Sequence, residues 1–252
     1  MRKAYLIDMD GVLVHGRRLI AGADGFIGRL RAAGRPFLVL TNNSRRTPAE
    51  HAARLSEAGL PIVESEIFTS AIATARFLRQ QRPEATVYAI GETGIIAALQ
   101  AEGITQTERS PDYVVLAETV AYSFEQVATA VRLITSGARF IATNPDVSGP
   151  SEHGIVPGCG AMAAMIQAAC GIRPYYVGKP NPLMMREALD QLGVRAADAT
   201  MVGDRMDTDI VAGTEAGMGT ILVLSGVTRA EDVGRFAYLP RLIVPSVAEI
   251  EV

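Results

Sequence analysis

The sequence is poor in cysteine and histidine, and it has no strong excess of charge of either sign. Two cysteines among 252 residues, Cys159 and Cys170, are too few for a disulfide framework, and free cysteine is usually buried, which favours two buried thiols. The histidines show no metal-ligand spacing; they are His15, His51 and His153. The net charge is −3, from 24 Lys and Arg against 27 Asp and Glu, and it gives no indication of nucleic-acid binding.

Long hydrophobic runs are also absent. The apolar residues near the N-terminus are interrupted by Asp8 and Asp10, and no small-residue cleavage site follows, so no signal peptide is predicted. The longest weakly charged stretch, residues 158–171, is too short to span a bilayer. We therefore expect a soluble, cytoplasmic protein that has neither a membrane nor a nucleic acid as its partner.

What the sequence does contain is an alternation of short apolar runs with longer helical patterns. Strand-like runs occupy residues 4–7, 37–40, 200–203 and 221–224, with a weaker one at 242–244. Apolar residues recur with helical spacing over residues 23–33, 48–58 and 182–192, and the last of these follows the start signal Asn181-Pro182. This alternation predicts an α/β fold, in which helices cover both faces of a parallel sheet.

The middle of the chain repeats this pattern on a smaller scale. Strands are predicted over residues 86–90, 113–116 and 139–142, and helices over 95–101, 124–136 and 161–169. We interpret residues 82–176 as a second, smaller α/β domain. It would be inserted into a discontinuous core domain formed by residues 1–81 and 177–252.

Polar residues follow the predicted strands of the core domain. Asp8 and Asp10 follow the first strand, and a group of carboxylates follows the strand at 200–203. The remaining polar groups come from the segment 41-TNNS-44 and from Lys179. The active site of an open α/β sheet lies beyond the carboxyl ends of its strands, so these groups are expected at one edge.

This set of side chains has a consistent chemical interpretation. Carboxylate oxygens bind hard cations such as Mg²⁺, whereas hydroxyl, amide and ammonium groups bind phosphate oxygens. A carboxylate beside a metal can attack phosphorus, and a second carboxylate can protonate the leaving oxygen and then activate water. Two neighbouring carboxylates repel one another unless a cation is present, which explains why Asp8 and Asp10 would require a metal.

The motifs and their order resemble those of the haloacid dehalogenase (HAD) phosphatase superfamily. The matching residues are Asp8-Met9-Asp10, Thr41-Asn42, Lys179, and Gly203-Asp204 with Asp209. Only 30 residues separate Asp10 from Thr41, but 137 separate Thr41 from Lys179. The resemblance therefore implies a Rossmann-like HAD core with the inserted domain as a type-2 cap. Three segments are similar in sequence to the corresponding segments of the NagD-like branch: 69-TSAIAT-74, 141-IATNPD-146 and 176-YVGKPNP-182.

The resemblance also implies roles for single residues. Asp8 would be the nucleophile that forms an aspartyl-phosphate, and Asp10 the general acid and base. Mg²⁺ would be held by Asp8, by the backbone carbonyl of Asp10 and by Asp204, while Asp209 would orient metal waters from outside the coordination shell. The phosphoryl oxygens would be bound by Thr41, Asn42, Asn43 and Lys179.

The cap of such an enzyme would select the leaving group, and Asn144 is a candidate for contacting it. The branch contains nucleotide, 4-nitrophenyl-phosphate, phosphoglycolate and pyridoxal-phosphate phosphatases. We expect a small phosphorylated metabolite as the substrate, with UMP as the first candidate and phosphoglycolate, pyridoxal phosphate or a sugar phosphate as alternatives. Phosphoryl transfer to a second hydroxyl group and phosphate-ligand binding without turnover also stay open. Caps of this size often pair, so a homodimer through the cap is a further expectation.

Overall fold

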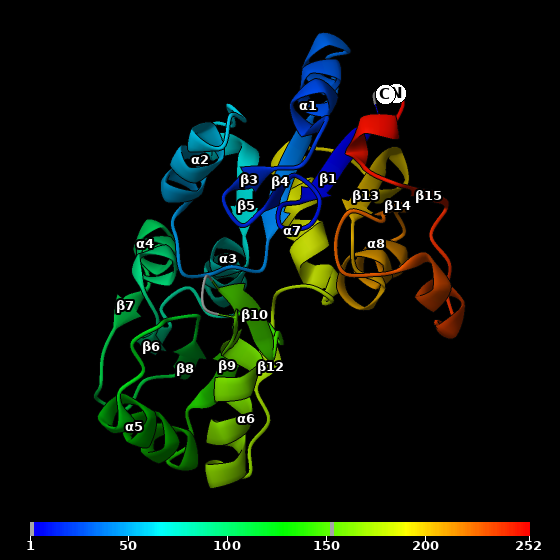
Figure 1. Cartoon of the computed structure of the whole chain (residues 1–252). Helices are drawn as coiled ribbons and strands as arrows, with labels where there is room; N and C mark the ends of the chain where they lie inside the picture. Colours follow the sequence, from blue (N-terminus) through cyan, green and yellow to red (C-terminus); the bar gives the residue numbers. More distant parts are fainter. Residues whose placement is uncertain (1–2, 152–153) are drawn as a thin grey trace. The chain divides into compact units, whose positions relative to one another are not determined.

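The computed structural model describes residues 3–151 and 154–252, so His153 lies outside it. The chain divides into two compact units (Figure 1). The first unit is formed by the chain up to Thr41, by Pro48–Phe68 and by Lys179–Val252. The second unit is formed by Asn42–Thr47 and Thr69–Gly178.

The first unit is built on a six-stranded sheet. Its strand order is β15-β14-β13-β1-β4-β5, and the pairs β1–β4, β1–β13, β13–β14 and β14–β15 are parallel. The strands are β1 (Ala4–Asp8), β4 (Phe37–Thr41), β5 (Ile67–Thr69), β13 (Ala199–Gly203), β14 (Gly219–Val223) and β15 (Leu242–Val244). Every residue of β1, β4 and β13 is buried, as expected for parallel strands that are covered on both faces.

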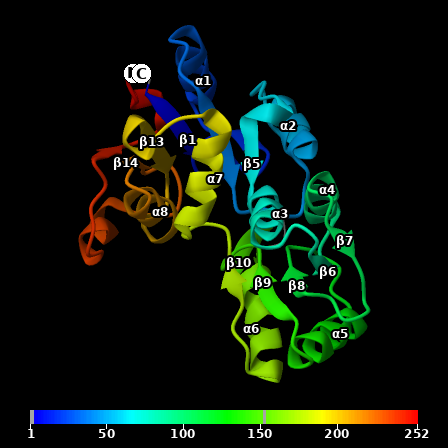
Figure 2. The same ribbon diagram turned by 180° about the vertical axis from the view of Figure 1, so that it is seen from behind.

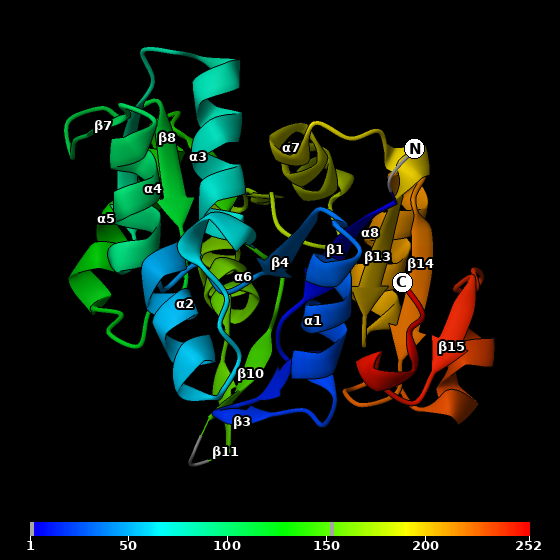
Figure 3. The ribbon, with the colours of Figure 1, turned by 90° about the horizontal axis from the view of Figure 1, so that it is seen from above.

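Helices cover this sheet on both sides. Alternate residues of β1, Tyr5 and Ile7, belong to one core with buried residues of α1 (Ala23–Ala32) and α2 (Pro48–Glu57). On the opposite face Leu222 packs in a separate cluster with two residues that precede α8 (Val211–Glu215). Figure 3 shows α1 and α7 (Pro182–Leu192) on opposite sides of the sheet. The predicted parallel α/β fold with a Rossmann-like core is confirmed.

The second unit contains a five-stranded parallel sheet of its own, visible from behind in Figure 2. Its strand order is β12-β9-β8-β6-β7, from β6 (Thr86–Ile90), β7 (Thr105–Gln106), β8 (Tyr113–Leu116), β9 (Arg139–Ala142) and β12 (Tyr175–Tyr176). Its helices are α3 (Ser70–Gln81), α4 (Thr93–Ala101), α5 (Phe124–Thr135) and α6 (Cys159–Cys170). Residues of β8, β9, α5 and α6 form its main hydrophobic cluster.

Two short hairpins complete the fold, and neither is predicted from the sequence. The hairpin of β2 (Val14–His15) and β3 (Arg18–Leu19) follows β1 in the first unit. The hairpin of β10 (Ser148–Ser151) and β11 (Gly154–Pro157) lies in the second. No helix in the described parts of the chain is both long and apolar enough to cross a membrane. Both cysteines are free thiols; Cys159 is buried and Cys170 is half-buried.

The second unit begins earlier in the chain than the predicted boundary at residue 82. The main difference is α3, which the prediction assigned to the core domain and which packs against α4 instead. Asn42–Thr47 and residues 177–178, also predicted in the core domain, belong to the second unit as well. Phe77 of α3 also stacks on Tyr175, with 5.2 Å between the ring centroids. The physical reason is that helix packing, and not the Pro-containing segment after the helix, decides which unit α3 joins.

Candidate active site

Parallel pairing brings three of the predicted motifs to one edge of the first unit's sheet. In the register of β1 with β4, Asp8 lies opposite Leu40. Thr41, the next residue of β4, therefore lies one position further toward the carboxyl end of the sheet than Asp8. In the register of β1 with β13, Ile7 lies opposite Val202, which places Asp204 just past the end of β13. Asp8, Thr41 and Asp204 therefore mark the carboxyl ends of three adjacent strands, where α/β sheets bind ligands.

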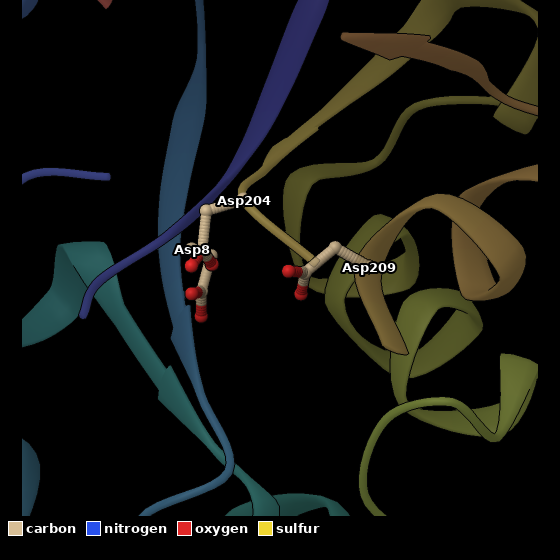
Figure 4. Close-up of side chains that lie close together, drawn as sticks. All are labelled: Asp8, Asp204 and Asp209. Carbon is tan, nitrogen blue, oxygen red and sulfur yellow. The ribbon is translucent and has the colours of Figure 1, made fainter. Parts of the chain in front are cut away.

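A buried group of carboxylates lies at this edge (Figure 4). Oxygen atoms of Asp8, Asp204 and Asp209 lie within 4.8 Å of one another, and all three side chains are buried. The ammonium group of Lys179 pairs with Asp8 Oδ1, and its Nζ lies 2.7 Å from Asp209 Oδ1. Only 3% of Lys179 is exposed, so its charge is held inside the protein by these carboxylates.

The charges in this group do not balance. Burial raises the pKa of Asp8 well above its ordinary value; Lys179 opposes this shift, while Asp209 and Asp204 add to it. Burial and the neighbouring Asp209 raise the pKa of Asp204 to about 6. Burial alone would lower the pKa of Lys179, but Asp209 and Asp8 outweigh it and raise that pKa. A cation added beside the carboxylates would relieve their repulsion.

Asp204 is oriented by the loop that follows β14. Its Oδ2 accepts a hydrogen bond from the Val227 backbone N–H at 2.7 Å, whereas its buried Oδ1 has no hydrogen-bond partner among the described residues. A Cβ at Gly226 would lie 1.9 Å from Asp204 Oδ2, and one at Gly11 would lie 2.5 Å from it. The two glycines allow the backbone to close around this carboxylate. A partnerless buried oxygen beside two further carboxylates fits a divalent cation that prefers oxygen ligands.

The carboxylate of Asp209 accepts hydrogen bonds from two different groups. Besides Lys179, it accepts the backbone N–H of Arg205 on Oδ2 at 3.1 Å. It comes from the π-helical turn Met206–Ile210, a type of turn that is frequent at functional sites. These contacts hold Asp209 against Lys179, in keeping with an orienting role, which stays a prediction. The adjacent Asp207 pairs with Arg205, with 2.8 Å between the charged groups.

The carboxylate of Asp10 lies outside the buried group and is about half exposed. Its Oδ1 lies 3.5 Å from the guanidinium group of Arg54, in α2. An exposed carboxyl group can exchange protons with solvent and with a substrate, as a general acid and base must. Nothing in a helical pattern marks which arginine turns toward a loop, so the contact with Arg54 is not predictable from the sequence.

Thr41 and Asn42 are neighbours in the chain, but they belong to different units. Thr41 is buried at the end of β4, and the boundary between the units falls directly after it. Asn42 donates its side-chain amide to Asp146 Oδ2 at 2.9 Å, within the second unit. Asn43 accepts the backbone N–H of Arg45 on its side-chain oxygen, as in an Asx turn.

Asn144 is fully buried in the second unit. Its side-chain amide donates to the backbone carbonyl of Asn42 at 2.8 Å, and its side-chain oxygen accepts the backbone N–H of Asp146 at 3.1 Å. The structure therefore brings Asn42 and Asn144 together, and separately Asp8, Asp204, Asp209 and Lys179. Sequence reasoning singled out the segment of Asp146 but did not identify another contributor to these groups, the loop 225-SGVT-228. The loop's position directly after a strand was the available signal.

Comparison with known proteins gives the same assignment over nearly the whole chain. A family model described as haloacid dehalogenase-like hydrolase matches residues 5–105, and a HAD-hydrolase-like model matches residues 176–250. A dihydroxyacetone phosphatase of Corynebacterium glutamicum (strain R) is 49% identical over 247 residues, which are 98% of this chain and 90% of that protein. The ribonucleotide monophosphatase NagD of Escherichia coli (strain K12) is 41% identical over 250 residues, 99% and 98% of the two chains. The solved structure of NagD from E. coli K-12 superposes with a TM-score of 0.95 at 40% identity, covering 99% of this chain and 98% of that one.

Proposed function

The chain belongs to the haloacid dehalogenase-like hydrolases, in their NagD-like branch, and from this premise we propose that it hydrolyses small phosphomonoesters with Mg²⁺ through an aspartyl-phosphate on Asp8. Its relatives are named phosphatases, and the chain is a phosphoric monoester hydrolase. The observation that carries the proposed mechanism is the buried group of Asp8, Asp204 and Asp209, paired with Lys179 at the carboxyl end of β1.

Asp8, Asp204 and the backbone carbonyl of Asp10 would hold the metal ion. Bound there, Mg²⁺ would offset the negative charge of the carboxylates and of the substrate phosphate. The partnerless Oδ1 of Asp204 and the excess of carboxylates over ammonium groups support this assignment.

In the first half of the reaction, a carboxylate oxygen of Asp8 attacks phosphorus and the bond from phosphorus to the leaving oxygen breaks. Asp10 gives its proton to that oxygen, so the leaving group departs as an alcohol. In the second half, Asp10 takes a proton from water, whose oxygen attacks phosphorus and releases inorganic phosphate and the free Asp8 carboxylate. Lys179 supports both halves, since its charge already faces Asp8.

Four residues are proposed to bind the phosphoryl group: Thr41, Asn42, Asn43 and Lys179. Thr41 qualifies by its place at the end of β4, next to the strand that carries Asp8. Asn42 qualifies as the next residue of the chain. The assignment of Asn144 to the leaving group stays a prediction; in the structure its side chain is buried and donates to the Asn42 carbonyl.

The substrate is a small phosphorylated metabolite. UMP stays our first candidate, and the 41% identity to a ribonucleotide monophosphatase supports a nucleotide. The 49% identity to a dihydroxyacetone phosphatase favours a second candidate, dihydroxyacetone phosphate. The prediction of a homodimer through the second unit is kept alongside these proposals.

Initial rates of phosphate release, measured with Mg²⁺ over a panel of phosphomonoesters, test the proposal. The panel contains UMP, dihydroxyacetone phosphate, phosphoglycolate, pyridoxal phosphate, a sugar phosphate and 4-nitrophenyl phosphate. We expect turnover that EDTA abolishes, that Asp8→Asn removes, and that differs by an order of magnitude or more in kcat/KM between the best and the other substrates. Asp190→Asn, an exposed change of the same kind, is the matched control and should retain full activity.

Equal inactivity of wild type and Asp8→Asn on every substrate would overturn the hydrolytic proposal and favour ligand binding without turnover. Phosphate that appears on an added alcohol instead of in water would favour a phosphoryl transferase. Trapping of radioactive phosphate on the wild-type chain, but not on Asp8→Asn, would support the aspartyl-phosphate directly.

A further inference from the structure

The loop that follows β14, residues 225-SGVT-228, is hydrogen-bonded to the segment that follows β1. We call it the Ser225 loop. The hydroxyl of Ser225 donates to the backbone carbonyl of Gly11 at 2.8 Å, and Nε2 of His15 donates to the backbone carbonyl of Ser225 at 2.7 Å. Gly11 directly follows Asp10, whose own carbonyl is a proposed metal ligand. Both the side chain and the backbone of Ser225 therefore contact the segment after β1.

The other end of the Ser225 loop is hydrogen-bonded to the segment that follows β13. The backbone N–H of Val227 donates to Asp204 Oδ2 at 2.7 Å, and that of Thr228 donates to the Asp204 carbonyl at 3.1 Å. The hydroxyl of Thr228 accepts the backbone N–H of Met206 at 3.1 Å. The loop thus connects the two segments that carry the proposed metal ligands, and all of these groups belong to the first unit.

Close packing leaves little room for the Ser225 loop to shift. A Cβ at Gly226 would lie 1.9 Å from Asp204 Oδ2, and one at Gly11 would lie 2.5 Å from the same oxygen. Two backbone segments therefore approach this oxygen, and the carboxylate must follow them if either one moves. Because Oδ2 is held in this way, Oδ1, which has no hydrogen-bond partner among the described residues, is the oxygen left for a cation.

A divalent metal would make the relative position of these two segments important. The carboxylates of Asp8 and Asp204 lie close together at this edge of the sheet (Figure 4). Mg²⁺ requires near-octahedral geometry, so its ligands must be held at fixed positions. Groups that hydrogen-bond to metal ligands orient them, and substituting such groups typically weakens metal binding by about 10–100-fold. A serine hydroxyl that joins one ligand-bearing segment to the loop around the other is placed to act in this way.

We propose that Ser225 and His15 are positioning residues for the metal site, which hold the backbone of Asp10 and Gly11 in place relative to Asp204. The inference rests on the proposed function. Neither residue is assigned a contact with the metal or with the substrate. It follows that their substitution weakens the binding of Mg²⁺, and that excess Mg²⁺ restores most of the activity.

Calorimetric titration of the full-length, metal-free protein with Mg²⁺, in the absence of substrate, tests this inference. We expect Ser225→Ala to raise the Kd for Mg²⁺ by about tenfold. His15→Ala should raise it by about threefold, because it removes one exposed hydrogen bond. Ser225→Thr keeps the hydroxyl and should recover most of the loss. Ser56→Ala, the same change at an exposed serine of α2, is the matched control and should leave the Kd unchanged.

Phosphate release from the best substrate of the panel, measured over a range of Mg²⁺ concentrations, separates a positioning role from other roles. Ser225→Ala should need more Mg²⁺ for half-maximal activity and should approach the wild-type kcat and KM when Mg²⁺ is in excess. If Ser225→Ala folds poorly, the comparison of His15→Ala with His15→Gln, which keeps a donor for the Ser225 carbonyl, gives the same test at an exposed position.

Three results would overturn the inference while the proposed function stands. The first is a wild type that binds Mg²⁺ and releases phosphate while Ser225→Ala and His15→Ala have the same Kd for Mg²⁺. The second is a lower melting temperature of the variants with an unchanged Kd, which would show a purely structural role. The third is a loss of kcat that excess Mg²⁺ does not restore. A wild type that neither binds Mg²⁺ nor releases phosphate would instead overturn the proposed function, and the inference with it.

Discussion

At the scale of single residues, Lys179 is notable because its charged ammonium group is almost completely buried. Its ammonium group is buried and paired with Asp8 and Asp209, while Asp204 adds a third carboxylate to the same group. Burying charges is costly, and removing one partner of a buried pair leaves the others uncompensated. Lys179 therefore stabilises the site mainly by preventing repulsion between its carboxylates.

We predict that Lys179→Met lowers the free energy of unfolding by about 3–5 kcal/mol when metal is removed with EDTA. The raised pKa values of Asp8 and Asp204 mean that acid would neutralise these carboxylates, so the loss should shrink as the pH falls. Urea unfolding at neutral and acidic pH measures both effects. Lys3→Met, at an exposed lysine, is the control and should stay within about 0.5 kcal/mol of wild type. A Lys179→Met variant as stable as wild type would show that the carboxylates are not ionised together.

At the scale of elements, the loop after β8 and the segment 42–47 support each other. The Ser44 hydroxyl accepts the backbone N–H of Glu118 at 2.9 Å, and the Ser44 N–H donates to Glu118 Oε2 at 3.2 Å. Burial, followed by repulsion from Asp146, raises the pKa of Glu118 from 4.5 to about 7. This carboxyl group thus titrates near neutral pH, close to Asp146 and Asn144.

The raised pKa of Glu118 predicts a pH-dependent stability of known sign. Between pH 4.5 and about 7 the folded chain holds a proton that the unfolded chain has lost, so stability falls as the pH rises. The fall should amount to about 2–3 kcal/mol across this range. Glu118→Gln removes the titration and keeps an acceptor for Ser44, so its advantage over wild type should grow with pH. Urea unfolding of both proteins at about pH 5 and about pH 7.5 measures this, and parallel curves would refute the assignment.

The elements themselves differ in how well the sequence predicts them. Strands 86–90, 113–116 and 139–142 and the helix 182–192 are confirmed with the predicted bounds, because each combines a clear apolar pattern with a nearby turn or cap. Helix α3 is not predicted, although Thr69 caps it by accepting the N–H of Ile72. Its buried residues are mostly small or polar, such as Ser70, Ala71 and Thr74, so they give a weak apolar pattern in the sequence.

Predictability also varies among the site residues. Asp8, Lys179, Asp204 and Asp209 could be placed together because each follows a strand or precedes a helix in a recognisable motif. The partners of Asn42 and Asn144 could not be predicted, because they depend on which side chains of distant segments meet in the second unit. The sequence indicates that an amide is present, but only the packing around it decides whether it faces a ligand or another residue.

At the scale of the whole molecule, the two units are predicted to respond to different ligands and conditions. The proposed metal ligands lie in the first unit, whereas Glu118 and its partner Ser44 lie in the second. A chain with two hydrophobic cores need not unfold in a single step, so the melting profile can contain one or two transitions. Either outcome reports how strongly the units depend on one another for stability.

We predict that Mg²⁺ raises the melting temperature, and that beryllium fluoride, which mimics a phosphoryl group on a carboxylate, raises it further. A ligand at about 100 times its Kd stabilises the folded state by about 2.7 kcal/mol, which corresponds to several degrees for a chain of this length. Asp204→Asn should reduce the Mg²⁺ response and Asp8→Asn should abolish the beryllium fluoride response, whereas Glu118→Gln should retain both. If the units melt separately, only the transition of the first unit should move with Mg²⁺. A Mg²⁺-induced shift confined to the transition of the second unit would contradict the proposal that Asp8 and Asp204 bind the metal. An equal response of Asp204→Asn and wild type would contradict it too.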